Sequence, residues 1–179
     1  QPKDADWSME DGDNFMIYNA DGTSALTNKS GAIVESPVLA STRLRGNVTQ
    51  QMPKKAFAVK LDKKHGVLDM PSHKRWVLLA NWKDRTLMRN EVAFGLADVF
   101  KQTFPNDGME WNPSGQHVEL VYNGVYVGNY YLCEQVKIDG NRLDINDPYD
   151  AEDAYSGNPA DYGYLLEADD GYDETWKFT

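Results

Sequence analysis

Cysteine and long apolar runs are scarce in this 179-residue sequence. Its single cysteine, Cys133, excludes an intrachain disulfide and any multi-cysteine zinc site. No run of about 18 apolar residues occurs, so the sequence predicts no membrane span. Positive charge is also scarce, because 18 Lys and Arg stand against 28 Asp and Glu, for a net charge of −10. This negative field disfavours nucleic acids and anionic membranes as partners.

Common catalytic motifs are missing as well. The sequence contains no GxSxG, HExxH, GxGxxG or P-loop pattern. Its three histidines lack the spacing of metal ligands, and the acidic stretch 144–163 lacks that of an EF-hand. Hydrophobic residues nevertheless make up 41% of the chain and aromatic residues 12%, a balance typical of a folded domain. The chemistry must therefore be sought in individual residues.

The clearest predicted helix spans residues 84–102. Apolar residues recur there at spacings of three and four, and Asp84 or Thr86 is the expected N-cap. The apolar stripe consists of Met88, Val92, Leu96, Val99 and Phe100. We expect this long helix to pack on a sheet.

Strand patterns dominate the remainder. Residues 56–61 alternate, so that Phe57, Val59 and Leu61 share one face. Residues 76–82 form a short apolar run that suits a buried strand or part of a helix.

The clearest hairpin spans residues 117–136. Asn123 and Gly124 supply the pair of positive φ angles that a type I′ turn needs, and Gly128 marks a bulge or a close backbone approach. Residues 163–169 are the last strand candidate. Together these patterns predict an α+β fold, with a mostly antiparallel sheet and at least one long packed helix.

Four charged residues fall in phase with apolar ones, where a charge must be paired or functional. Lys55 either holds phosphate oxygens or reaches water from the entrance of its strand. Arg89 needs a carboxylate or phosphate partner, in a site or in a structural ion pair. Glu134 either belongs to a site, with a raised pKa, or forms a salt bridge with Arg89 or Lys55. For Glu167 the same two alternatives stay open.

Five sequence blocks follow one another between residues 41 and 179. They are RGN at 45–47, PKK with its following strand at 53–61, WVLLANWKDRTLMRNEVAFGLA at 76–97, VYNGVYVGNYYLCEQVKIDGNRL at 121–143 and GYLLEAD at 163–169. In order and spacing, these blocks resemble the spore-coat protein H (CotH) kinase family. Residues 1–40 lie outside the resemblance and are expected to form a lead-in and the first strands.

The resemblance implies an atypical protein-kinase-like fold that binds ATP with Mg²⁺ or Mn²⁺ and transfers phosphate to a protein substrate. It also implies a bacterial protein that is extracellular or attached to the cell surface. A later Trp- and Asp-rich block of the family, expected to hold the metal, has no counterpart before Thr179. We therefore expect residues 41–179 to be the N-terminal part of the domain, C-terminally incomplete, without a metal site and inactive as this fragment.

Four residues occupy motif positions of the resemblance. We expect Arg45 and Lys55 to bind the phosphates of ATP, and Lys55, Arg89 and Glu134 to serve catalysis. Arg89 would pair with a carboxylate, and Glu134 would mark the start of a hinge. The alternative is a non-catalytic secreted or cell-surface module, structural or carbohydrate-associated, because the aromatic content and the Tyr-bearing acidic loop suit a surface polysaccharide.

Overall fold

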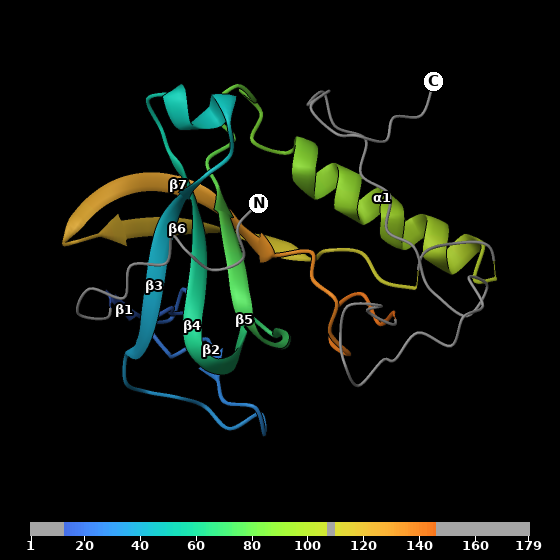
Figure 1. Ribbon diagram of the computed structural model, residues 1–179, viewed down its shortest axis with the longest axis horizontal. Helices are drawn as coiled ribbons and strands as arrows, with labels where there is room; N and C mark the ends of the chain where they lie inside the picture. Colours follow the sequence, from blue (N-terminus) through green and yellow to red (C-terminus); the bar gives the residue numbers. More distant parts are fainter. Residues whose placement is uncertain (1–12, 107–109, 146–179) are drawn as a thin grey trace, which may run out of the picture.

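The computed structural model describes residues 13–106 and 110–145, in which seven strands form one antiparallel sheet (Figure 1). The strands are β1 (Asp13–Phe15), β2 (Leu26–Thr27), β3 (Val38–Arg45), β4 (Ala56–Val67), β5 (Met70–Leu79), β6 (Gly115–Tyr122) and β7 (Val125–Glu134). Their order is β1-β3-β4-β5-β7-β6, and β2 pairs with β4. In Figure 1 the sheet curls, and the β6–β7 hairpin lies across β3, β4 and β5.

The turn of the β6–β7 hairpin agrees with its sequence. Asn123 and Gly124 adopt φ angles of 49° and 77°, which confirms the predicted turn. Pairing then shifts from Val121 with Tyr126 to Leu120 with Gly128, whose φ is 103°. This shift confirms the bulge, and the bulge bends the hairpin.

The turn between β4 and β5 carries no such signal. Val67 pairs with Met70, so the turn consists of Leu68 and Asp69, with φ angles of 51° and 64°. A leucine rarely adopts a positive φ. Here the Leu68 N–H donates to the carbonyl of Ala25 at 3.0 Å, so a contact with the segment before β2 helps to hold the turn.

The main core lies on one face of the curled sheet. Val59, Leu61, Trp76 and Leu132 are almost fully buried there, and Phe57 packs against them at the edge. The predicted common face of residues 57, 59 and 61 is confirmed. Residues 76–82 resolve largely into a strand, because Trp76 to Leu79 belong to β5.

The predicted fold class is wrong. A 15-residue helix, α1 (Arg89–Thr103), accompanies the sheet in the described ranges, and none of its residues is buried. The described chain is mostly antiparallel sheet with one short helix, not a helix-rich kinase-like fold. Within residues 13–106 and 110–145, no helix is long and apolar enough to cross a membrane.

The face of α1 that contacts the sheet is not its apolar stripe. Val92, Leu96 and Phe100 of the stripe are 50%, 50% and 59% exposed. The half-buried Phe94 instead packs against Tyr131 of β7, with ring centroids 6.0 Å apart. Residues 92 and 94 lie about 200° apart around a helix, so the contact is made by the opposite face. Periodicity locates the apolar stripe but does not determine which face meets the sheet.

The start of α1 is held by a side chain five residues upstream. The Asp84 carboxylate accepts hydrogen bonds from the backbone N–H groups of Arg89 at 2.9 Å and Thr86 at 3.0 Å. The N-cap position itself is Met88, which makes no side-chain cap. Asn81 donates to the Leu87 carbonyl at 3.1 Å and closes the same turn. The helix was predicted to begin at residue 84, but it begins at Arg89. Asp84 lies before the helix and caps its first turn from there.

Replacement of Asp84 by alanine should lower the melting temperature measured by circular dichroism, because an N–H group of the first turn loses its acceptor. Asp84→Asn keeps an acceptor oxygen and should recover part of the loss. The neighbouring, exposed Lys83→Ala serves as the control and should melt like the parent protein. Equal melting temperatures for Asp84→Ala and the parent would contradict the capping role.

Candidate functional site

A buried ion pair lies where the chain leaves β7. Glu134 is the last residue of the strand, and its Oε1 accepts a hydrogen bond from Nη1 of Arg142. The Arg142 side chain is fully buried and that of Glu134 almost fully. The other carboxylate oxygen of Glu134, Oε2, accepts the backbone N–H of Ser114 at 2.9 Å. Two donors from different segments therefore fix this carboxylate.

The indole of Trp76 forms the floor beneath the pair. Trp76 pairs directly with Glu134 across β5 and β7, so both side chains stand on the same face of the sheet. The Arg142 guanidinium lies over the indole, with Cζ 4.8 Å from the ring centroid. A desolvated cation–π contact of this kind stabilises by about 2 kcal/mol. The Trp76 N–H donates to the His73 carbonyl at 3.1 Å, which fixes the ring.

The guanidinium is incompletely satisfied. Its Nε and Nη2 are buried and contact no acceptor within residues 13–106 and 110–145. Burial lowers the pKa of Arg142, and Glu134 opposes this effect. Burial likewise raises the pKa of the Glu134 carboxyl, against the Ser114 N–H and Arg142. The pair is therefore held by the fold at a considerable desolvation cost.

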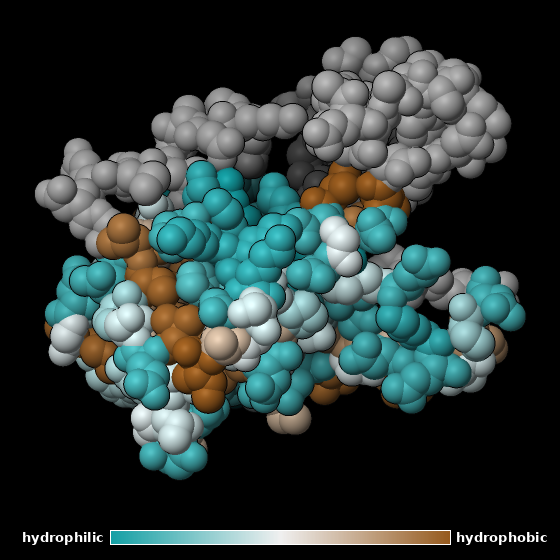
Figure 2. All heavy atoms as spheres, turned by 90° about the horizontal axis from the view of Figure 1, so that it is seen from below, coloured by the Kyte–Doolittle hydropathy of each residue, from teal (hydrophilic) through white to brown (hydrophobic). Residues whose placement is uncertain are grey.

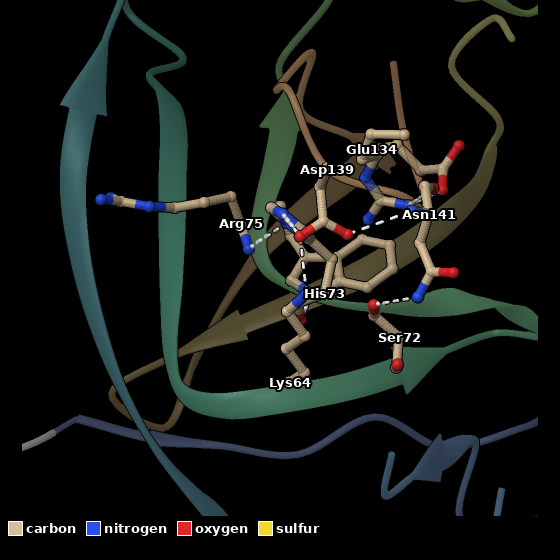
Figure 3. Close-up of polar contacts among 9 residues, drawn as sticks. Lys64, Ser72, His73, Arg75, Glu134, Asp139 and Asn141 are labelled. Carbon is tan, nitrogen blue, oxygen red and sulfur yellow. Dashed lines mark hydrogen bonds and ion pairs between the residues drawn. The ribbon is translucent and has the colours of Figure 1, made fainter. Parts of the chain in front are cut away.

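A second cluster joins the loop after β7 to β4 and β5 (Figure 3). Asp139 Oδ2 lies 2.6 Å from Lys64 Nζ and 3.8 Å from His73 Nε2. Asn141 donates from its amide to the Ser72 carbonyl at 3.0 Å. The turn at 139–142 closes through a hydrogen bond from the Arg142 N–H to the Asp139 carbonyl at 2.8 Å.

His73 is a neutral member of this cluster. Its Nδ1 accepts the backbone N–H of Arg75 at 2.9 Å, so in the neutral ring Nε2 carries the proton and faces Asp139. Burial lowers the pKa of His73, and the nearby Arg142 charge lowers it further. Lys64 is therefore the cationic partner of Asp139 at neutral pH.

The structure places Arg45 and Lys55 at the same end of the β3–β4 pair. Arg45 is the last residue of β3 and pairs with Ala56, the residue directly after Lys55. The carbonyl of Lys55 accepts the hydroxyl of Tyr130 at 2.9 Å, which ties this point to β7. The side chain of Arg45 is exposed, and that of Lys55 is half-buried.

The loop between these two cations is tightly folded. Gly46 has a φ of 93°, and a Cβ atom on it would lie 1.8 Å from the Thr49 hydroxyl oxygen. Position 46 therefore accepts glycine alone without rearrangement. The ammonium of Lys55 donates to the carbonyl of Gln50, within the short 3₁₀ helix η1 (Val48–Gln51). RGN thus marks a loop that folds back over the start of β4.

Arg89 and Glu134 are not neighbours in an ion pair. The Arg89 side chain is 82% exposed, and its Nε lies 3.6 Å from Asp84 Oδ1. Among the alternatives for Glu134, the salt bridge is present, but with Arg142 instead of Arg89 or Lys55. Glu167 lies outside the described residues.

Arg142 is the site residue that the sequence pattern missed. The turn-forming run of Asp139, Gly140 and Asn141 was a usable signal, because a turn there brings the next residue back towards the end of β7. No apolar periodicity surrounds Arg142, so nothing in the pattern indicated that it would be buried.

Comparison with family models matches residues 42–178 to the family described as CotH kinase protein. The match covers most of the 179 residues, and the chain therefore belongs to the CotH kinase protein family. This confirms the resemblance read from the five sequence blocks. No curated protein matches the chain.

The described residues do not fit the divalent metal that the family implies. Within residues 13–106 and 110–145, no group of three or more His, Cys, Asp or Glu side chains is placed to hold a metal ion. Mg²⁺ requires carboxylate oxygens in near-octahedral geometry. The described part of the chain lacks that set of oxygen ligands.

Removal of one partner of the buried pair should be strongly destabilising. Arg142→Met leaves Glu134 buried without a cation and should reduce the free energy of unfolding by about 3–5 kcal/mol. The double variant Glu134→Leu/Arg142→Met removes both charges and should recover much of this loss, as measured by urea denaturation. Losses that simply add in the double variant would contradict the coupling of the two side chains.

Proposed function

We propose that this chain serves ATP-dependent phosphoryl transfer to a protein substrate, with Arg45 and Lys55 at the phosphates. The observation that carries the proposal is the position of these two residues at one end of β3 and β4, where Arg45 pairs with the residue after Lys55 and the folded loop at Gly46 joins the two strands. Phosphoryl transfer depends mainly on positioning and on neutralising phosphate charge. Membership of the CotH kinase protein family supports the same reaction.

The proposed roles follow from where each side chain lies. Arg45, with five donors in a planar fork, would contact phosphate oxygens in pairs, and Lys55 would act as a compact point charge. ATP would supply the transferred phosphoryl group, a substrate hydroxyl would accept it, and ADP and a proton would leave.

Two further residues have different proposed roles. Arg89, exposed at the N-terminus of α1, would meet a carboxylate or phosphate brought by the substrate. Glu134 would act through Arg142, by holding the segment 135–145 against β5 and β7. In this proposal Glu134 is a positioning residue. A bacterial protein at a secreted or cell-surface location, and the use of Mg²⁺ or Mn²⁺ by the full-length protein, belong to the same proposal.

Nucleotide binding tests the proposal directly. Titration calorimetry with ATP and Mg²⁺ or Mn²⁺, on this chain and on the full-length protein, should show little binding by this chain. The full-length protein should bind, and its binding should weaken in Lys55→Ala and Arg45→Ala. Loss of one charge-assisted contact should raise Kd by about tenfold to a hundredfold. Lys83→Ala is the matched control, because Lys83 is exposed and lies outside the β3–β4 loop.

Two results would overturn the proposal. No ATP binding by either protein would favour the non-catalytic, carbohydrate-associated alternative. Binding that is equally tight in Lys55→Ala, Arg45→Ala and the parent would remove these two cations from the phosphate site.

A further inference from the structure

A lysine-rich pocket lies towards the opposite end of β4 from Arg45 and Lys55. It has a volume of about 530 Å³, and its lining includes Lys29, Lys63, Lys64, His65 and Lys74. The surface seen from below in Figure 2 is largely hydrophilic, with apolar side chains in a few separate patches. Four lysines around one pocket stand out in a chain whose net charge is −10.

An irregularity in β4 builds this lining. In a regular strand Lys63 and Lys64 would point to opposite faces of the sheet, yet both line the pocket. The register between β4 and β5 shifts between Lys60 and His65, which allows consecutive side chains to face the same space.

The turn at residues 28–30 forms another wall. Asn28 Oδ1 accepts the backbone N–H groups of Ser30 at 2.9 Å and Ala32 at 3.0 Å. These contacts fix the turn that presents Lys29. His65, buried at the base, lies with Nδ1 3.1 Å from the Thr27 carbonyl oxygen.

Positive charge exceeds negative charge around the pocket. Lys64 contacts Asp139, and the ammonium of Lys74 donates to the backbone carbonyl of Asp62 at 2.8 Å. The carboxylate of Asp62 lies 3.9 Å from His65 Nε2. Four lysines thus line the pocket, with two carboxylates close by. A pocket lined mostly by one sign of charge concentrates ligands of the other sign.

We propose that this pocket binds a phosphorylated segment of the protein substrate. Its cations are all lysines, which bind phosphate oxygens as compact point charges. A phosphate group carries a charge of about −1.5 to −2, which calls for more than one cation. The identity of the segment as substrate rests on the proposed function, but the binding itself does not.

The distance along β4 sets the expected spacing in the substrate. Lys55 and Lys64 are separated by about nine residues of extended strand, or at most roughly 30 Å. An extended peptide needs about nine residues to span that length. In an extended segment, the bound phosphate would therefore lie at most about nine residues from the hydroxyl that is modified.

Fluorescence anisotropy with a synthetic peptide carrying two phosphoserines, measured without ATP, tests the pocket. Lys29→Glu/Lys63→Glu/Lys74→Glu should weaken binding by at least about tenfold, since several charge-assisted contacts are lost. This variant leaves the Lys64 contact with Asp139 intact. The matched control, Lys83→Glu/Lys101→Glu/Lys137→Glu, makes the same charge change on exposed lysines elsewhere and should bind like the parent.

Several outcomes would overturn the proposal. One is that both triple variants weaken binding of the phosphorylated peptide to the same extent. Another is that the unphosphorylated peptide, or a version with glutamates in place of phosphoserines, binds as tightly as the phosphorylated peptide. A third is that a sulfated polysaccharide binds more tightly than the phosphorylated peptide. If the triple variant fails to fold by circular dichroism, Lys63→Gln/Lys74→Gln replaces it, and unchanged affinity in that pair would also overturn the proposal. Phosphopeptide binding without ATP binding would separate this pocket from the proposed catalytic function.

Discussion

The contact on which the candidate site depends is the ion pair between Glu134 and Arg142, buried on the indole of Trp76. After β7 ends, residues 135–145 form no strand and are held by individual contacts. The Glu134 carboxylate links this segment both to β7 and to the backbone of Ser114. A buried ion pair contributes little net stability, because desolvation offsets its attraction. Its consequence here is positional, because the pairing of Arg142 with Glu134 fixes the path by which the chain leaves the sheet.

The turn that carries Arg142 also connects the ion pair to the lysine-rich pocket. Asp139, three residues before Arg142, contacts Lys64, and Lys64 lines the lysine-rich pocket. One short turn therefore has a buried arginine on one side and a surface lysine on the other. Tyr130, on the same face of β7, reaches the backbone of Lys55. The loop at residues 46–54, the ion pair and the pocket all contact the β4–β5–β7 part of the sheet, and the pairing of these strands sets the distances between them.

The sequence could predict features that depend on local chemistry. Asn123 and Gly124 indicate a turn wherever they occur between strands, and alternation along β4 identifies its buried face. Glu134 alternates with apolar residues along β7, and this alternation correctly predicted that its side chain is buried. The family could also be predicted, because its short sequence blocks contain residues that the local backbone requires. Gly46, which lies close to Thr49, is an example.

Features that depend on contacts distant in sequence could not be predicted. The partner of Glu134 is fixed by how the loop folds back over Trp76, which no periodicity records. The strongest apolar stripe of the helix is exposed, whereas Phe94, on the opposite face, contacts the sheet. Lys63 and Lys64 share a pocket because of a register shift that only pairing with β5 produces. In each case tertiary packing overrides a correct local pattern.

The central claim is that Arg142 lies desolvated on Trp76 while paired with Glu134, and NMR of the arginine side chains tests it most directly. With ¹⁵N-labelled arginine, and assignment by comparison with an Arg142→Lys variant, the Nε–H of Arg142 should exchange slowly with water because it is buried. Its resonance should also be shifted by the indole ring current, and Trp76→Leu should abolish that shift. A rapidly exchanging Nε–H at the position of a solvated arginine would contradict the account.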